Sequence, residues 1–546
     1  MLKNIKKMLK KEEKIEEQSR AYQMIRILRP EAAKEKKKTK ETKYPRFKIL
    51  STRKISISNI PPVRYPLIDP YAFAVIKKEP FENTLVYRVG EPILNREEEE
   101  KLTRLKHGLL QTINISMSAV RDETGLIEFL EEKVQDLLSQ YGFSLTSQQY
   151  LKIMYYIYRD FVGLNEIEPL MHDPFIEDIG VDGVGIPVYI VHQKFGSLKT
   201  NIIYNDIERL REFVVKLAER CDRYISYAEP LLDGTLPDGS RVQATLTGDI
   251  TTKGPTFSIR KFRGEPLSPV DMIMLKTASS ELIAYLWYTI EARRNILICG
   301  GTSTGKTSFL NAISLFISPE SKIVSIEDTR ELSLPHEHWI PGVARTGFGG
   351  TNVGEVTMFD LLRESFRQNP DYLIVGEIRG KEAYVMFQGM ASGHPSFSTI
   401  HAASLDDVIK RLESPPIELS PSLIEALDII IVMIHAREKG KSARRIKEVM
   451  EIQNIDKATG SANAVRAFAW IPSEDRIEYK GYSWVLNKIS IDKGIPIREI
   501  YREIDCRKRV LDWLVNKNIR SIKNVSKYIV MYQRDKDQLL KMIREG

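Results

Sequence analysis

The C-terminal half of the chain alternates short, almost continuous apolar runs with stretches of helical periodicity. The runs are NILICG (295–300), KIVSIE (322–327), YLIVGE (372–377), FSTIH (397–401) and DIIIVMI (428–434). Strands that are apolar on both faces belong to sheets that are covered on both sides, and parallel strands are joined by helical crossovers. The pattern therefore predicts an α/β domain with a mostly parallel sheet and helices on both faces. A hairpin (464–471 with 476–482) and two or three helices are expected after it.

The N-terminal half has a mixed pattern. Short β-rich runs broken by Pro, Asn and Gly occupy residues 71–95, and charged helical sequence follows over about 96–140. Thr146 and Gln149 form a capping box that begins an apolar helix ending near Gly163. Further elements are expected as a helix over 207–220 and a turn and strand over 236–246. These elements predict a smaller α+β domain.

The main domain boundary is predicted after a stretch rich in turn and charged residues, RKFRGEPLSPVD (260–271). Ser268 suits the N-cap of a new helix, and Pro269 suits its first turn. The expected organisation is a tail at 1–45, an N-terminal domain at 46–262, a linker at 263–269 and a C-terminal domain at 270–546. A division of the N-terminal domain into subdomains 46–140 and 141–262 is left open.

The charge of the chain is concentrated in the tail. Residues 1–45 hold 15 Lys and Arg against 7 Asp and Glu, which accounts for the whole formal net charge of +8. Such a segment is expected to be mobile and solvated, with a tether to an anionic membrane surface or an acidic partner as the alternative. Because residues 46–546 carry no net charge, we do not expect nucleic acid as the partner.

Cysteine content and apolar run length indicate the compartment. Three scattered cysteines make neither a disulfide framework nor a CxxC metal site. No apolar run reaches the roughly 20 residues that a membrane-spanning helix needs. We therefore expect a protein of the reducing cytoplasm.

A phosphate-binding loop follows the first apolar strand. Its residues are Gly300, Gly301, Thr302, Ser303, Thr304, Gly305, Lys306 and Thr307, which match the pattern GxxxxGK[ST] in full. The glycines let successive backbone N–H groups face one concavity, Lys306 adds a charge for the β- and γ-phosphates, and Thr307 is a ligand for Mg²⁺. The strand before the loop and the helical sequence after it fit this interpretation. The sequence thus predicts binding of ATP with Mg²⁺.

Acidic residues stand at the ends of two further strands. Glu377 follows an apolar run after one intervening glycine and is expected to reach Mg²⁺ or its water shell. Glu327, with Asp328, ends another run, where a carboxylate orients or deprotonates the attacking water. His401 also ends a strand, and chemistry alone leaves open whether it is structural or contacts the γ-phosphate. Arg241 and Arg260 are two of several arginines that are weak candidates for charge stabilisation.

Together these stretches resemble the type II/type IV secretion and pilus-assembly ATPases. The likeness rests on the phosphate loop, the acidic segment IVSIEDTREL, the glycine-containing LIVGEIRG and the histidine segment GHPSFSTIHA, and it covers roughly residues 65–515. It is most similar to the archaeal branch, which drives archaellum or type IV-like pilus assembly. The four-cysteine zinc module frequent in the bacterial type II branch has no counterpart among the three cysteines.

The resemblance implies a fold, roles and partners. It implies a RecA-like C-terminal motor domain and a smaller N-terminal domain, assembled as a hexameric ring with nucleotide between the two domains. It makes Glu327 the catalytic glutamate, Glu377 the acid on the Mg²⁺ side and His401 a γ-phosphate-side residue. Arg241 and Arg260 become arginine fingers. The implied partner is a polytopic membrane platform protein, which holds the ATPase at the inner face of the cell membrane.

Other functions are compatible with a phosphate loop. A RecA-like nucleic-acid motor, such as a helicase, recombinase or DNA-transfer ATPase, shares the expected core. A scaffold ring that binds nucleotide without hydrolysing it is a second alternative, and intact Lys306 and Glu327 speak against it. A small-molecule kinase leaves the large N-terminal domain without a role.

Overall fold

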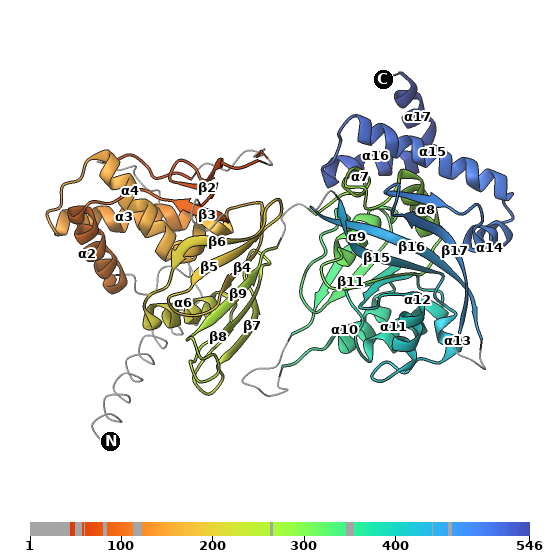
Figure 1. Ribbon diagram of the computed structural model, residues 1–546, viewed down its shortest axis with the longest axis horizontal. Coiled ribbons are helices and arrows are strands. Elements are labelled where there is room, and N and C mark those ends of the chain that lie inside the picture. Colours follow the sequence, from red (N-terminus) through yellow and green to blue (C-terminus); the bar gives the residue numbers. More distant parts are fainter. Residues whose placement is uncertain are drawn as a thin grey trace, which may run out of the picture. The chain divides into compact units, whose positions relative to one another are not determined.

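The computed structural model divides into two compact units, Met1–Phe262 and Arg263–Gly546 (Figure 1). It describes residues 44–49, 57–58, 60–79, 84–112, 123–262, 266–345, 354–438, 441–456 and 461–545. Most of the predicted basic tail, residues 1–43, and residues 263–265 of the predicted linker lie outside this range. No helix within it is long and apolar enough to cross a membrane. Both units are mixed α/β structures built on large sheets.

The N-terminal unit is built on a nine-stranded sheet with the order β1-β2-β3-β6-β5-β4-β9-β8-β7. Among the strand pairs that the described residues form in this sheet, only β3–β6 is parallel. The strands are β1 (Val63–Ile68), β2 (Ala72–Lys78), β3 (Leu85–Gly90), β4 (Ile176–Val181), β5 (Pro187–His192), β6 (Gly196–Ile203), β7 (Leu231–Thr235), β8 (Arg241–Thr245) and β9 (Thr256–Arg260).

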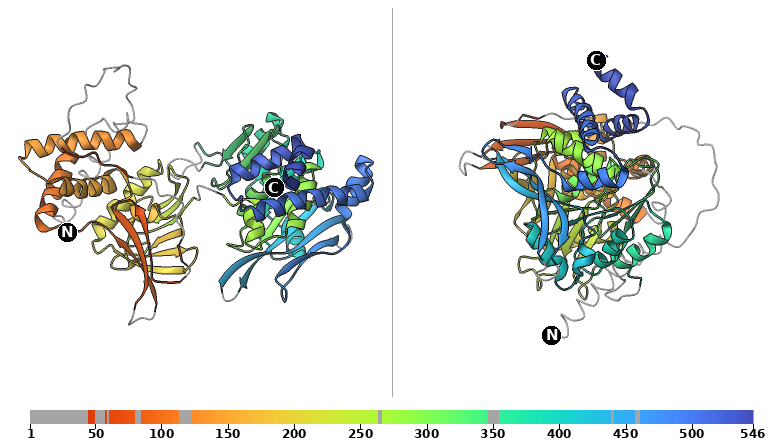
Figure 2. Two further views of the ribbon diagram at one scale, coloured as in Figure 1. Left: turned by 90° about the horizontal axis from the view of Figure 1, so that it is seen from above. Right: turned by 90° about the vertical axis from the view of Figure 1, so that its right-hand side faces the viewer.

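Helices α2 (Arg96–Thr112), α3 (Glu123–Gln140) and α4 (Ser147–Ile157) lie together beside this sheet, in orange in Figures 1 and 2. The helical sequence expected over 96–140 is thus two helices. The capping box predicted at the start of α4 is confirmed, because Gln149 N donates to Thr146 Oγ1 at 3.3 Å. A π-helical turn, Tyr158–Val162, and the short α5 (Glu168–Met171) follow α4.

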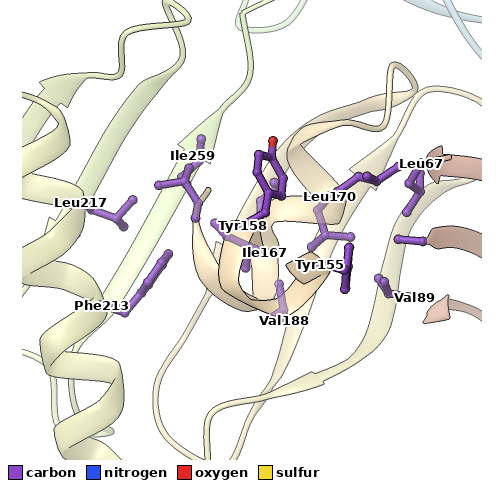
Figure 3. Close-up of a cluster of buried hydrophobic side chains, with 14 of the residues drawn as sticks. Leu67, Val89, Tyr155, Tyr158, Ile167, Leu170, Val188, Phe213, Leu217 and Ile259 are labelled. Carbon is purple, nitrogen blue, oxygen red and sulfur yellow. The ribbon is translucent and has the colours of Figure 1, made fainter. Parts of the chain in front are cut away.

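Helix α6 (Ile207–Arg220) confirms the sequence prediction residue for residue. Asp206 caps it, and the buried residues Leu210, Phe213, Val214, Leu217 and Ala218 repeat at helical spacing along one face. Figure 3 shows Phe213 and Leu217 of this face in the same buried cluster as Ile259 of β9 and Val188 of β5. This cluster joins sheet and helices into a single core.

The C-terminal unit contains a second nine-stranded sheet, ordered β12-β11-β13-β14-β10-β15-β16-β17-β18. All five predicted apolar runs form parallel strands in it, and β17–β18 is the predicted hairpin. The strands are β10 (Ile296–Gly300), β11 (Ile323–Glu327), β12 (Trp339–Val343), β13 (Tyr372–Val375), β14 (Ser396–Ile400), β15 (Ile429–Glu438), β16 (Lys441–Ile455), β17 (Ala462–Ile471) and β18 (Arg476–Tyr479).

Two strands of this sheet are not predicted by the sequence pattern. β12 is a half-exposed edge strand that includes Pro and Gly, so it has no apolar run. β16 continues the sheet antiparallel to β15, and its first half is dominated by charged residues. The sheet is therefore parallel from β12 to β15 and antiparallel from β15 to β18.

Alternate residues of the central strands enter two cores on opposite faces of the sheet. Ile296 and Ile298 of β10 pack with α8 (Ser280–Glu291), α9 (Lys306–Ser314) and the C-terminal helices. Leu297 and Cys299 pack on the other face with α11 (Glu382–Ala391) and α12 (Leu405–Glu413). Figure 1 shows the two helical layers on either side of the strands. The prediction of a sheet covered on both faces is confirmed.

The remaining helices of this unit complete the two layers. Ser268 caps α7 and Pro269 stands in its first turn, as the sequence predicts. The helices are α7 (Pro269–Met274), α10 (Met358–Ser365), α13 (Pro421–Ile424), α14 (Trp484–Lys493), α15 (Ile497–Asn516), α16 (Ile522–Arg534) and α17 (Lys536–Glu545).

Candidate nucleotide site

The loop between β10 and α9 has the backbone that its glycines permit. A Cβ on Gly300 would lie 2.6 Å from both Met433 O and Thr304 Oγ1. Gly305, the N-cap of α9, has a φ of 90°, and Ser303 has a φ of 58°. These values require left-handed backbone at two positions of one short turn. The turn ends at the N-terminus of a helix, where free backbone N–H groups attract anions.

Lys306 is folded into this loop. It is 7% exposed, and its Nζ donates to Gly300 O at 3.1 Å and to Gly301 O at 2.9 Å. Burial lowers the pKa of Lys306, and the charge of Glu377 opposes that shift. Thr307 follows in the first turn of α9 and is half-buried. The ammonium group is thus held over the concavity by weak carbonyl acceptors that a phosphate oxygen can replace.

The other predicted residues of this unit lie at the same edge of the sheet. Strands β11, β13, β14 and β10 are parallel neighbours, so their carboxyl ends meet at one edge. Glu327 is the last residue of β11, Glu377 follows β13 after Gly376, and His401 follows β14 directly. Along this edge the phosphate loop follows β10, His401 follows the neighbouring β14, Glu377 follows β13, and Glu327 ends β11.

Gly376 explains why a glycine separates Glu377 from its apolar strand. A Cβ at this position would lie 3.1 Å from Cγ of Glu327. Gly376 N donates to Ile326 O at 2.8 Å, so the two strand ends are joined up to this point. The absence of a side chain leaves room for the Glu327 side chain.

Glu327 is a buried carboxyl group with two different oxygens. It is 2% exposed, and its Oε1 accepts from the N–H groups of Glu331 and Leu332 at 2.9 Å each. Its Oε2 is buried and has no hydrogen-bond partner among the residues that the structure describes. Burial raises the pKa of Glu327 to about 7, although the two N–H donors act against the shift. A carboxyl group with this pKa and one free oxygen suits a general base.

Glu377 lies between two positive or protonatable groups. Its Oε1 lies 3.0 Å from Nε2 of His401 and has no hydrogen-bond partner among the residues that the structure describes, and its Oε2 is paired with Arg379. Burial and the charge of Lys306 lower the pKa of His401, and Glu377 acts in the opposite direction. The structure therefore brings Lys306, Glu377 and His401 into one electrostatic group.

Arg241 and Arg260 belong to the N-terminal unit, whereas every other predicted site residue belongs to the C-terminal unit. They are directly opposite each other on the antiparallel strands β8 and β9. Arg241 donates to both carboxylate oxygens of Asp233, at 3.2 and 2.8 Å. The charge of Arg260 acts on Asp178 of the neighbouring strand. The two arginines thus form a pair at one place on their own sheet.

Two residues near the site were not singled out by the sequence. Glu331 N donates to Glu327 Oε1 at 2.9 Å, and the charge of Glu331 raises the pKa values of both Glu327 and Lys306. Arg444 of β16 donates from Nε to Ser303 O at 3.2 Å. Glu331 has a sequence signal, because it lies four residues after Glu327 in the same acidic segment. Arg444 has none, since its strand was not predicted.

The side chains at this edge fit a triphosphate with Mg²⁺. The loop supplies N–H groups and an ammonium group for phosphate oxygens, and Thr307 and Glu377 supply the hard oxygen donors that Mg²⁺ requires. The unpartnered Oε2 of Glu327 supplies an acceptor for a water molecule.

Comparisons with known proteins identify the family of the chain. The profile of a family described as type II/IV secretion system protein matches residues 167–468. An uncharacterized protein of Methanocaldococcus jannaschii is 36% identical over 87% of this chain and 90% of its own length. The type IV secretion system protein PtlH of Bordetella pertussis is 31% identical over 44% of this chain and 79% of its own. The VirB11 ATPase from the Brucella suis type IV secretion system is 24% identical, with a TM-score of 0.27, over 52% of this chain and 93% of that one.

Proposed function

This chain belongs to the type II/IV secretion system protein family, and on that basis we propose that it is an ATP-hydrolysing motor. It powers assembly of an archaeal type IV pilus-like filament, an archaellum or a type II-like secretion system. Its relatives include a protein of an archaeon and a type IV secretion system protein of Bordetella pertussis. The profile match spans the strands that carry both arginines, the phosphate loop, both glutamates and His401.

The observation that carries the proposal is the convergence of Lys306, Glu377 and Glu327 at one edge of the sheet. The loop N–H groups and Lys306 bind the phosphates, while Thr307 and Glu377 hold Mg²⁺, which neutralises charge on the phosphate oxygens. Oε2 of Glu327 accepts a proton from the attacking water, and its two N–H donors fix the carboxyl group in place. His401, next to Glu377, contacts the γ-phosphate side.

The remaining roles concern the whole assembly. The C-terminal unit is a RecA-like domain, a proposal supported by its parallel strand order β11-β13-β14-β10-β15 with the phosphate loop after β10. Arg241 and Arg260 of domain 46–262 act as arginine fingers on nucleotide bound between the domains. Subunits form a hexameric ring in the cytoplasm, docked at the inner face of the cell membrane through a polytopic platform protein. The proposed organisation keeps the linker at 263–269 and the basic tail at 1–45.

Phosphate release by the purified full chain tests the proposal. We expect Mg²⁺-dependent ATP turnover that is lost in Lys306→Ala together with nucleotide binding, and lost in Glu327→Gln with nucleotide binding retained. The matched control is Lys322→Ala, a half-buried lysine that directly precedes β11 and donates to Gln368 O, at the opposite edge of the sheet. Undiminished turnover in either site variant contradicts the assignment, and turnover that requires added DNA favours a nucleic-acid motor instead.

A further inference from the structure

The β15–β16 hairpin lies against the phosphate loop on the side away from the acidic residues. Arg444 donates from Nε to Ser303 O at 3.2 Å, and its Cδ lies 3.5 Å from where a Cβ of Gly305 would stand. The Met433 side chain of β15 approaches the same position, at 3.9 Å. Arg444 therefore covers the outer side of the loop at its two left-handed residues.

The neighbouring residue fixes the direction of the Arg444 side chain. Arg445 is 1% exposed and donates to both carboxylate oxygens of Asp475, at 2.7 and 3.0 Å, and to Leu275 O at 3.0 Å. Successive side chains of a strand point to opposite faces of the sheet. Because the Arg445 side chain is buried on one face by its hydrogen bonds to Asp475, the Arg444 side chain points to the other face, toward the loop. The position of Arg444 is thus set by the packing of β16.

The order of the strands gives the bound nucleotide a direction. Glu377 and Glu327, the residues of the γ-phosphate end, follow strands on one side of β10, and β15 and β16 lie on the other side. A triphosphate that runs from the acidic residues across Lys306 places its nucleoside toward β16. We propose that Arg444 binds the nucleoside end of the nucleotide, a specificity contact that rests on the proposed ATPase function.

The chemistry of the guanidinium group suits this role. Arg444 Nε donates a hydrogen bond to Ser303 O. Neither Nη group of Arg444 has a hydrogen-bond acceptor among the residues that the structure describes. A planar guanidinium group stacks on a base and donates to ribose oxygens. Its bond to Ser303 O fixes the direction of the guanidinium group, so the two Nη groups are available for the nucleoside.

Isothermal titration of the full chain with ADP and with inorganic tripolyphosphate, both with Mg²⁺, separates this role from phosphate binding. We expect Arg444→Ala to weaken ADP binding about tenfold and to leave tripolyphosphate binding within about twofold of the wild type. Lys306→Ala is expected to weaken both. Lys447→Ala, an exposed lysine on the same strand, is the matched control and is expected to change neither.

Each outcome decides between the two proposals. Unchanged ADP affinity in Arg444→Ala, or equal weakening of ADP and tripolyphosphate, overturns the nucleoside contact while leaving the ATPase proposal in place. A wild-type chain that binds neither compound overturns the ATPase proposal and the contact that rests on it. Arg444→Gln, with a melting temperature matched to the wild type, serves as the second variant and is expected to behave as Arg444→Ala.

Discussion

The Glu327 side chain must meet two requirements of a general base that oppose each other. A general base needs a proton affinity near the working pH, which burial provides, and it needs a fixed orientation, which hydrogen bonds provide. Hydrogen bonds to a carboxylate lower its pKa, so each demand weakens the other. The structure assigns them to different atoms: two N–H groups donate to Oε1, and no described residue donates to Oε2. The net result is a pKa raised to about 7.

The pH dependence of turnover follows from this pKa. Because the carboxylate is the active form, kcat/KM is expected to rise with pH through about 7 and then level off. Glu327→Gln is expected to lower turnover by about 10² to 10⁴ and to lose this rise. Steady-state phosphate release between pH 5.5 and 8.5 measures both effects. A wild-type profile with no change around pH 7 contradicts the role of Glu327.

The same shift has an opposite consequence for stability. A carboxyl group whose pKa is raised on folding holds its proton more tightly in the native state. Its contribution to the free energy of unfolding is therefore fully present below the ordinary glutamate pKa and is lost as the pH rises through about 7. Above about pH 7 the Glu327 carboxylate is in its active form, but its protonation no longer adds to the free energy of unfolding.

At the scale of elements, the hairpin β15–β16 connects the loop to the rest of the unit. Arg445 crosses from β16 to Asp475, which lies in the turn between β17 and β18. Asp475 also accepts from Trp470 Nε1 at 3.2 Å. The pairing with Arg445 holds the pKa of Asp475 well below its usual range. The ion pair between Arg445 and Asp475 thus connects β16 to the β17–β18 hairpin.

Removal of Arg445 is expected to destabilise the C-terminal unit. Its guanidinium group is buried, whereas the side chain of Asp475 is 26% exposed and stays partly hydrated, so loss of the hydrogen-bonded pair costs about 1.5 to 3 kcal/mol. Arg445→Met is therefore expected to lower the free energy of unfolding in urea by about that amount. Arg509→Ala removes an exposed i,i+4 pair with Asp505 and is expected to cost less than about 0.5 kcal/mol. Equal effects of the two variants contradict a structural role for the buried pair.

The elements that the sequence predicts are those whose burial is visible in their composition. β10, β11, β13 and β15 are almost continuous apolar runs because helices cover both faces, β14 adds buried Ser and Thr to this pattern, and α6 has a single apolar face. β12 and β16 escape prediction because an edge strand needs little apolar surface, and because Arg445 is buried through an ion pair whose partner lies 30 residues away. Pairing across such a distance leaves no local pattern.

The same distinction applies to the site. The loop and the acidic strand ends are contiguous motifs, so Lys306, Glu327 and Glu377 could be found from their spacing. Arg444 reaches the loop only through the register of β16 on β15, which pairs it with His435. A residue that acts through strand register is invisible until the register is known.

At the scale of the whole molecule, the proposed site residues are divided between two compact units. Arg241 and Arg260 are held side by side on β8 and β9, so a rigid movement of the N-terminal unit would carry both together. The N-terminal core continues under these strands through Val242 and Ile259. Under the proposed function, both arginines would therefore act together on the nucleotide bound by the C-terminal unit.

Replacing the arginines tests whether the two units act on one nucleotide. Arg241→Ala and Arg260→Ala are each expected to lower kcat by about 10³-fold or more with much smaller effects on ADP binding, because arginine fingers act on transition-state charge. Asp233→Ala is the control, since it removes the partner of Arg241 and keeps the guanidinium group. Phosphate release and ADP titration give the two readouts. Turnover at the wild-type level in both arginine variants contradicts a shared site.

The motor interpretation requires that nucleotide state changes the arrangement of the two units. Small-angle X-ray scattering of the assembled full chain measures this directly in the empty state, with ADP, and with ATP held by Glu327→Gln. We expect distinct scattering profiles for the ATP-loaded and ADP-loaded states, with the empty state differing from the ATP-loaded one. Identical profiles in all three states, with nucleotide binding verified by titration, would contradict the account.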